Sequence, residues 1–137
     1  MPIRVVRFGT PRAPNEGPRL GTVRRPPRGV KKTDYGRRDY FDLWLPDLAP
    51  SARLVSYAYA QDFTPRRWAA YARRYRSEMR APAPQRLIAL LAALSRQANF
   101  SVGCYCEDET RCHRSLLREL LSEAGAEIED RGMRGEE

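Results

Sequence analysis

The spacing of hydrophobic residues along the chain predicts alternating extended segments and helices. Apolar residues alternate with basic ones in residues 3–8, and short apolar stretches follow at 20–24 and 40–45. Residues 100–106 form a nearly continuous apolar run that an acidic turn closes, a pattern typical of a buried strand. Apolar residues at helical spacing predict helices at 51–59, 64–80, 85–96 and 111–124.

Residues suited to turns and helix ends support these boundaries. Ser51 and Thr64 are good N-cap residues, and Pro65 suits the first position of a helix. Residues 81–84 contain two prolines and predict a linker before the third helix. Gly103 lies inside the predicted strand at 100–106, which favours the close approach of another backbone at that point.

Length and element order together indicate one α/β domain. A chain of 137 residues with 42% hydrophobic residues is long enough to bury a core as a single domain. Helices that alternate with strands predict a three-layer type of domain over residues 1–126, with a short, mainly parallel sheet flanked by helices. Residues 127–137 are polar, and we expect this C-terminal tail to fray.

Cysteine usage and hydropathy bear on where the protein resides. Three cysteines, an odd number, argue against a secreted fold held by disulfides. The chain shows no signal peptide and no apolar stretch of transmembrane length. We therefore expect a cytoplasmic protein without a membrane partner.

Every cysteine and the one histidine lie within residues 99–124. Strand alternation places the side chains of Cys104 and Cys106 on the same face. Cys112, His113 and Arg114 follow at the predicted start of the last helix. Because parallel sheets bind ligands at the carboxyl ends of strands, against helix N-termini, this edge is the candidate functional site.

Three interpretations of this stretch remain open. In the first, it is an anion or small-molecule site in which Cys112 is the nucleophile, His113 transfers protons and Arg114 holds the anion. In the second, Cys104, Cys106, Cys112 and His113 bind zinc, although adjacent helical ligands would diverge by about 100°. In the third, the cysteines are small buried apolar residues, and His113 and Arg114 only cap and solvate a helix.

The charge of the chain favours an anionic partner. The formal net charge is +8, which suits a phosphorylated small molecule or a nucleic acid. The proline-containing loop at residues 24–32 carries several cations, of which Arg24, Arg28 and Lys31 are candidate anion-binding residues. Thr10 follows the first predicted strand and would lie at the same edge if that strand is parallel to the cysteine strand. A solvated basic loop is the alternative interpretation.

The arginines of the helix at residues 66–80 suggest a second class of partner. Such a basic face suits a nucleic-acid backbone, so a nucleic-acid-binding module is the rival hypothesis. The simpler interpretation of these arginines is a solvated surface.

Two groups of residues resemble domain-of-unknown-function family 488. Residues 25–32, followed by Leu48-Ala49-Pro50-Ser51, resemble the family's W-P-R-G-x-x-K loop and its L-A-P-S segment, with Pro26 in place of the frequent tryptophan. Cys104-Tyr105-Cys106 with Cys112-His113-Arg114 resembles its cysteine-containing strand followed by C-H-R at a helix start. The resemblance spans about residues 3–126 and implies a small α/β domain without implying a particular activity.

These observations predict a pocket that binds a phosphate-bearing small molecule, with thiol-dependent catalysis as an extension of that role. The pocket would form between the loop at residues 24–32 and the strand-to-helix edge that carries Cys106. The hypothesis requires this loop to lie near His113. The sequence specifies neither a cofactor nor an oligomeric state.

Overall fold

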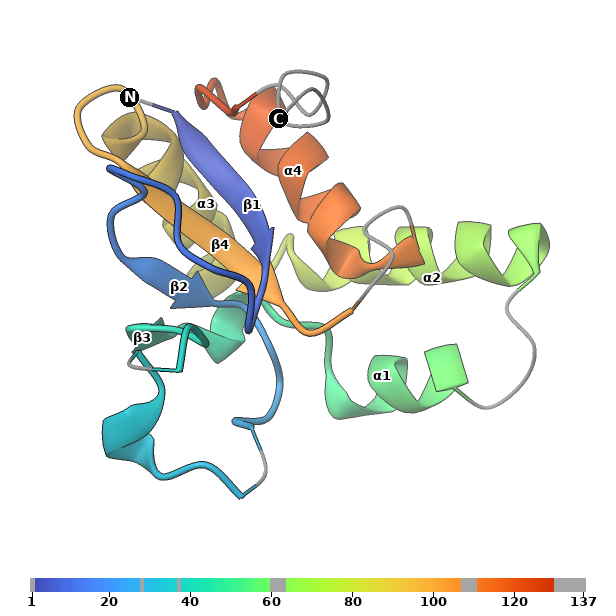
Figure 1. Cartoon of the computed structure of the whole chain (residues 1–137). Coiled ribbons are helices and arrows are strands. Elements are labelled where there is room, and N and C mark those ends of the chain that lie inside the picture. Colours follow the sequence, from blue (N-terminus) through green and yellow to red (C-terminus); the bar gives the residue numbers. More distant parts are fainter. Residues whose placement is uncertain (1, 28, 37, 60–63, 107–110, 130–137) are drawn as a thin grey trace.

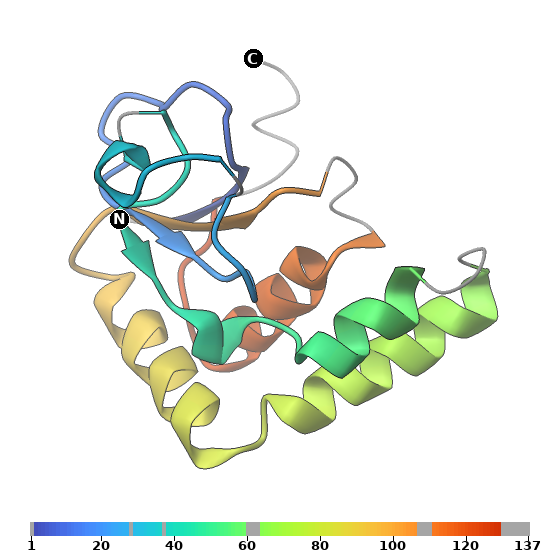
Figure 2. The same ribbon diagram turned by 90° about the horizontal axis from the view of Figure 1, so that it is seen from below.

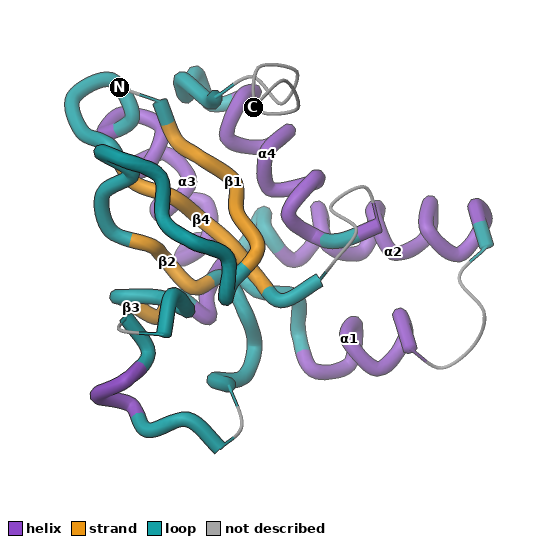
Figure 3. The backbone as a smooth tube through the Cα atoms, viewed as in Figure 1, coloured by secondary structure: helices purple, strands orange, loops and turns teal. Residues whose placement is uncertain are grey.

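The computed structural model in Figure 1 describes residues 2–27, 29–36, 38–59, 64–106 and 111–129. Their strands form one parallel sheet in the order β1-β4-β2-β3. The strands are β1 (Ile3–Arg7), β2 (Arg19–Gly21), β3 (Leu43–Trp44) and β4 (Phe100–Cys104), drawn in orange in Figure 3. The α/β class and the parallel sheet predicted from the sequence are confirmed.

Strand β4 lies in the middle of the sheet, so a strand from late in the sequence pairs with two strands from the start of the chain. It pairs with β1 on one side, where Arg7 lies opposite Cys104, and with β2 on the other, where Gly21 lies opposite Gly103. The carboxyl ends of β1, β2 and β4 therefore meet at one edge of the sheet. This edge is where the cysteine-containing segment leaves the sheet for the last helix.

All four helices named here lie on one face of the sheet, as Figure 2 shows. They are α1 (Ala52–Tyr59), α2 (Pro65–Glu78), α3 (Pro82–Leu94) and α4 (His113–Glu123). Loops and the short 3-10 helix η1 (Lys32–Asp34) cover the opposite face, so that layer contains no α-helix among the described residues. None of the described helices has both the length and the apolar composition to cross a membrane.

The observed helix boundaries agree with the sequence in the middle of the chain and differ near the prolines and the cysteines. Thr64 caps α2 by accepting a hydrogen bond from the Arg67 amide, as its side chain predicts. Helix α3 begins at Pro82 rather than at residue 85, because a proline at the first helical position needs no hydrogen-bond partner. Helix α4 begins at His113, two residues later than predicted, with Cys112 as its N-cap residue.

The core consists of two hydrophobic clusters. The larger cluster lies between the sheet and the helices, where Val102, Tyr75 and Leu117 are fully buried. The Tyr75 hydroxyl donates to the Leu48 carbonyl at 2.7 Å, which satisfies the one polar atom that this side chain buries. A smaller cluster packs Cys104 and Cys112 against aromatic side chains, including Phe8.

Part of the tail that was expected to fray is held against β1. The Ile3 amide donates to the Glu127 carbonyl at 2.8 Å, and the Glu129 amide donates to the Ile3 carbonyl at 2.8 Å. Ile128 forms a parallel bridge with Ile3 and packs against the larger core cluster. The apolar side chain of Ile128 explains why these residues pair, and residues 130–137 lie outside the described part.

Gly103 meets the backbone of β1 as closely as its position in the strand predicts. A Cβ atom at this residue would lie 2.6 Å from the carbonyl oxygen of Val6. We expect Gly103→Ala to lower the free energy of unfolding by about 1–3 kcal/mol because the strand has no room for a methyl group. Urea unfolding measures the effect, and Gly103→Val is expected to lower the free energy of unfolding further. Equal stability of all three proteins would contradict this close approach.

Candidate functional site

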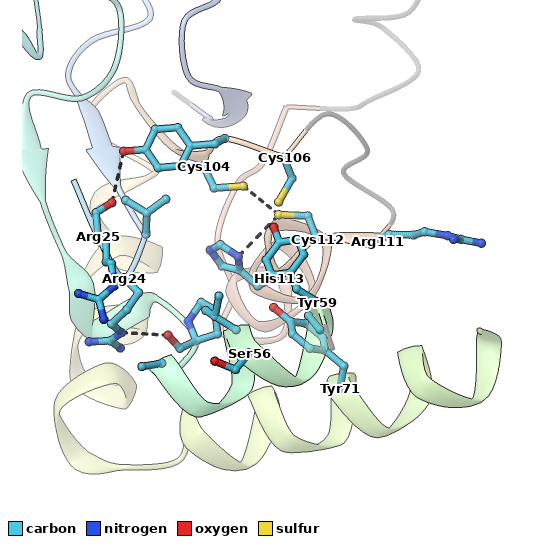
Figure 4. A pocket seen from close by; sticks show the side chains of 16 residues that line it. Arg24, Arg25, Ser56, Tyr59, Tyr71, Cys104, Cys106, Arg111, Cys112 and His113 are labelled. Atoms are coloured by element: carbon cyan, nitrogen blue, oxygen red, sulfur yellow. Dashed lines mark hydrogen bonds between the residues drawn. The ribbon is translucent and has the colours of Figure 1, made fainter. Parts of the chain in front are cut away.

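A pocket of about 580 Å³ opens at the carboxyl edge of the sheet, between β4, α1 and the start of α4. Figure 4 shows its 16 lining residues. They come from the segment after β2, from α1, from Tyr71 of α2 and from the cysteine-containing stretch. The start of the basic loop and the cysteine edge thus share one cavity, and Arg24 and His113 both line it.

Three cysteine sulfurs gather at the floor of this pocket. The Sγ atoms of Cys104, Cys106 and Cys112 all lie within 4.8 Å of one another, and those of Cys104 and Cys112 are 2.8 Å apart. All three are free thiols. Cys104 and Cys112 are 1% and 2% exposed, whereas Cys106 is only partly buried. Cys106 is therefore the thiol that a molecule in the pocket reaches most easily.

The position of Cys112 as N-cap residue turns its side chain toward that of His113. Cys112 has extended backbone angles, φ −123° and ψ 151°, while His113 is the first residue of the helix. The Cys112 sulfur consequently lies 3.6 Å from His113 Nδ1, the contact that Figure 4 draws. The predicted divergence of about 100° between these neighbours is wrong, because it requires both residues to be helical.

Hydrogen bonds define the tautomer of His113. Its Nε2 atom lies 2.6 Å from the Thr22 carbonyl oxygen and 3.2 Å from the Thr22 hydroxyl. Because a carbonyl oxygen can only accept, Nε2 carries the proton and Nδ1 presents a lone pair to Cys112. Burial lowers the pKa of His113 to about 4, so the imidazole is neutral near pH 7.

The three thiols differ in their tendency to ionise. Hydrogen bonds with Cys104 and Cys112 lower the pKa of Cys106 well below its ordinary value. Hydrogen bonds with its two neighbours and burial raise the pKa of the Cys104 thiol. The partly exposed Cys106 is therefore the thiol of the cluster that ionises most easily.

The structure brings together some of the residues predicted for the site. Arg24, Cys106, Cys112 and His113 all line the pocket. Arg24, however, uses its guanidinium group within the protein, where it donates to three backbone carbonyls of residues 46–50. It therefore shapes the pocket wall through the segment that carries the L-A-P-S sequence.

Other predicted residues lie elsewhere. Arg114 is buried and donates to the Cys106 carbonyl, so it supports the backbone of the cysteine segment rather than lining the cavity. Thr10 closes a turn by donating its hydroxyl to the Arg7 carbonyl at 2.6 Å. Lys31 is exposed beside η1 and is not among the lining residues, and Arg28 lies outside the described residues.

Several lining residues carry no signal in the sequence. Tyr59 and Tyr71 come from the apolar stripes of α1 and α2, and only the packing of these helices brings them to the cysteines. Burial raises the pKa of Tyr71, which keeps its phenol protonated. The exposed residue Arg25 adds a guanidinium group to the lining, whereas the side chain of Arg111 extends away from the other labelled residues in Figure 4. The pocket therefore combines cations, aromatic rings and sulfur atoms.

The comparisons identify one family. The family model described as "DUF488-N3a: Active DUF488-N3 subclade" matches residues 3–125. No curated protein and no solved structure matches the chain. The matched segment contains every residue that lines the pocket.

Proposed function

The chain belongs to the DUF488 family, and we propose that its pocket binds a small molecule that carries both a phosphate group and an aromatic ring. The observation that carries the proposal is the composition of one cavity. Guanidinium groups, tyrosine rings and apolar side chains line it together at the carboxyl edge of a parallel sheet. Ligands of parallel α/β domains bind at this edge.

The cations of the lining favour a phosphate over a neutral group. Arg25 and Arg111 are exposed lining residues, and the net charge of +8 raises the local concentration of anions. A guanidinium group binds phosphate oxygens through two parallel hydrogen bonds. Among the predicted anion-binding residues, Arg24 supports the wall, so we assign direct phosphate contact to its exposed neighbour Arg25.

The rest of the cavity suits an aromatic ring. Tyr59, Tyr71, Val55 and Ala58 contribute aromatic and aliphatic surface on the side formed by α1 and α2. A volume of about 580 Å³ lies within the range of roughly 300–1,000 Å³ that small-molecule sites occupy. A nucleoside monophosphate has the required size, charge and ring.

The thiols give this pocket reactive groups as well as shape. Cys106 is the thiol that a bound ligand reaches, whereas Cys112, the nucleophile expected from the sequence, is 2% exposed. In a catalytic version of the proposal, Cys106 therefore contacts the ligand. His113 is 5% exposed and faces Cys112, so its effect on the ligand is transmitted through the sulfur cluster.

The arginines of α2 support a polymer-binding role less well than their number suggests. The guanidinium groups of Arg67 and Arg74 both lie over the ring of Tyr57, at 4.1 and 4.2 Å from its centroid. Arg76 forms ion pairs with Glu119 and with a second glutamate of α4. These contacts use much of the charge within the protein, so the pocket is the better candidate.

Calorimetric titration with AMP, adenosine and inorganic phosphate tests the proposal. We expect AMP to bind about tenfold or more tightly than adenosine, because a hydrogen-bonded charge pair contributes about 1.5–3 kcal/mol. Arg25→Ala is expected to remove most of this difference. Arg66→Ala, which changes an exposed arginine of α2 outside the pocket, serves as the matched control.

Two results would contradict the proposal. The first is equal affinity for AMP and adenosine, which would mean that the lining arginines do not recognise the phosphate. The second is an AMP affinity that falls equally in Arg25→Ala and Arg66→Ala, which would indicate general charge attraction. A steep salt dependence for a DNA oligonucleotide, reduced by Arg66→Ala, would instead support the polymer-binding hypothesis.

A further inference from the structure

We propose that Cys104, Cys106, Cys112 and His113 form a binding site for a soft divalent metal ion, with Zn²⁺ as the natural occupant. The inference goes beyond the proposed anion binding, because it uses the sulfur and imidazole atoms at the floor and none of the arginines. It rests on the convergence of three cysteine sulfurs from two separate segments of the chain, with His113 Nδ1 3.6 Å from the sulfur of Cys112.

The distances between donors suit a tetrahedral ion. Zinc lies about 2.3 Å from sulfur and about 2.0 Å from nitrogen, so two sulfurs on one ion are about 3.8 Å apart and a sulfur–nitrogen pair about 3.5 Å. The Cys112 sulfur and His113 Nδ1 are 3.6 Å apart. The three sulfurs lie within 4.8 Å of one another, and the Cys104–Cys112 pair needs to separate by about 1 Å from its 2.8 Å contact.

His113 is prepared for metal binding by its hydrogen bonds. Ligating histidines commonly donate their second ring N–H to a carbonyl or carboxylate oxygen, which fixes the ring and the tautomer. Here Nε2 donates to the Thr22 carbonyl at 2.6 Å, and the lone pair of Nδ1 faces the Cys112 sulfur at 3.6 Å. Cys112 and His113 are adjacent in the sequence, which is unusual for two ligands of one ion. The extended backbone of Cys112 directs its side chain toward that of His113.

The surroundings supply positive charge for three thiolates. Cys112 stands at the N-terminus of α4, where the helix dipole stabilises negative charge. Arg114 is buried beside the cysteine-containing segment and donates to the Cys106 carbonyl. Three thiolates and one divalent ion leave a net charge of −1, which the Arg114 guanidinium offsets.

The donor set also indicates the class of metal and its role. Thiolates and imidazole select zinc and other soft or borderline ions over magnesium and calcium. Three cysteines and one histidine complete a tetrahedral shell, an arrangement typical of structural zinc sites. Such an ion would link the end of β4 to the start of α4 at the pocket and, through the hydrogen bond of His113, to Thr22.

Titration of the reduced, metal-free protein with Co²⁺ tests the site, because cobalt reports its own ligands. We expect one cobalt per chain, the visible absorption of a tetrahedral ion and a near-ultraviolet thiolate-to-cobalt band that Zn²⁺ abolishes. Cys106→Ser is expected to reduce the intensity of that band to about two thirds, as one of three thiolates is lost. Ser56→Ala, at another position of the pocket lining, is expected to bind cobalt like the wild type.

A second measurement covers variants that fold poorly. The unfolding midpoint of the wild type is expected to rise with Zn²⁺ and to stay unchanged with Mg²⁺, since only an ion that binds the native state stabilises it. His113→Ala is expected to reduce the rise. Absence of the thiolate band in the wild type, or an unchanged band in both Cys106→Ser and His113→Ala, would overturn the site.

The two proposals fail separately. Arg25→Ala is expected to lose AMP discrimination while it binds cobalt normally, because Arg25 is no part of the donor set. Cys106→Ser is expected to lose metal affinity, and its AMP titration is judged against the metal-free wild type. A protein that binds AMP but no cobalt would refute the metal site alone, and the reverse result would refute the anion site alone.

Discussion

Arg19→Ala is expected to lower the free energy of unfolding by about 3–5 kcal/mol, the cost of breaking a buried ion pair from one side. The Arg19 side chain is 0% exposed, and that of Glu16 is 3% exposed. The guanidinium Nε donates to the Glu16 carboxylate at 2.6 Å, and Nη1 donates to the Asp39 carbonyl at 2.7 Å. The substitution leaves a buried carboxylate without its counter-charge.

Urea unfolding near pH 7 measures this loss, and Arg4→Ala provides a control. Arg4 pairs with Glu129 at 3.0 Å with side chains that are 26% and 13% exposed, so its loss is expected to cost about 1 kcal/mol or less. The double variant Glu16→Gln with Arg19→Met is expected to be more stable than Arg19→Ala, since no charge remains buried. Similar losses for Arg19→Ala and Arg4→Ala would contradict the buried pair.

The Glu16–Arg19 pair also makes the free energy of unfolding depend on pH. Burial raises the pKa of Glu16, but hydrogen bonds from Arg19, the Ala13 amide and Ser101 outweigh it, so the folded-state pKa lies below the ordinary 4.5. A depressed pKa contributes stability that is present above pH 4.5 and is lost as the pH falls through the folded-state value. Glu16→Gln is therefore expected to be less stable than the wild type at pH 7 and to lose less stability on acidification.

The buried pair also shows which parts of the fold the sequence predicts and which parts it does not. The strands β1 and β4 and the helix α2 follow from local periodicity and caps, because each pattern spans a few neighbouring residues. Nothing local distinguishes Arg19 from the many solvated arginines of the chain, since its partners come from separate segments that meet only in the fold. The buried polar network around Arg19 is therefore a feature that the sequence does not predict.

The candidate site likewise contains some residues that the sequence identifies and others that only the fold brings to the pocket. Clustering of the cysteines and the histidine identifies the stretch, because the residue types themselves carry the signal. The contact between the Cys112 sulfur and His113 Nδ1 depends on a helix that starts two residues later than expected, and no pattern in the sequence specifies that shift. Tyr59 and Tyr71 reach the pocket through the packing of α1 on α2, which is a property of the assembled domain.

Arg24→Ala is expected to lower the free energy of unfolding much more than Arg25→Ala, although the two residues are adjacent. Arg24 donates to the carbonyls of Pro46, Ala49 and Pro50 at 3.0–3.2 Å, and so holds the segment that leads into α1. Its removal leaves these acceptors without a charged donor, and we expect a loss of about 2–4 kcal/mol in the free energy of unfolding. Arg25 is exposed, so Arg25→Ala is expected to change stability by about 0.5 kcal/mol or less.

Unfolding and AMP titration of the same two variants separate structure from recognition. Arg25→Ala is expected to weaken AMP binding about tenfold while its urea midpoint stays near that of the wild type. Arg24→Lys is expected to recover little stability, because one ammonium group cannot replace a planar guanidinium that donates to three carbonyls at once. If Arg24→Ala were as stable as Arg25→Ala, the wall of the pocket would not depend on Arg24. In that case Arg24 would return to the role of a phosphate ligand, as the sequence alone suggested.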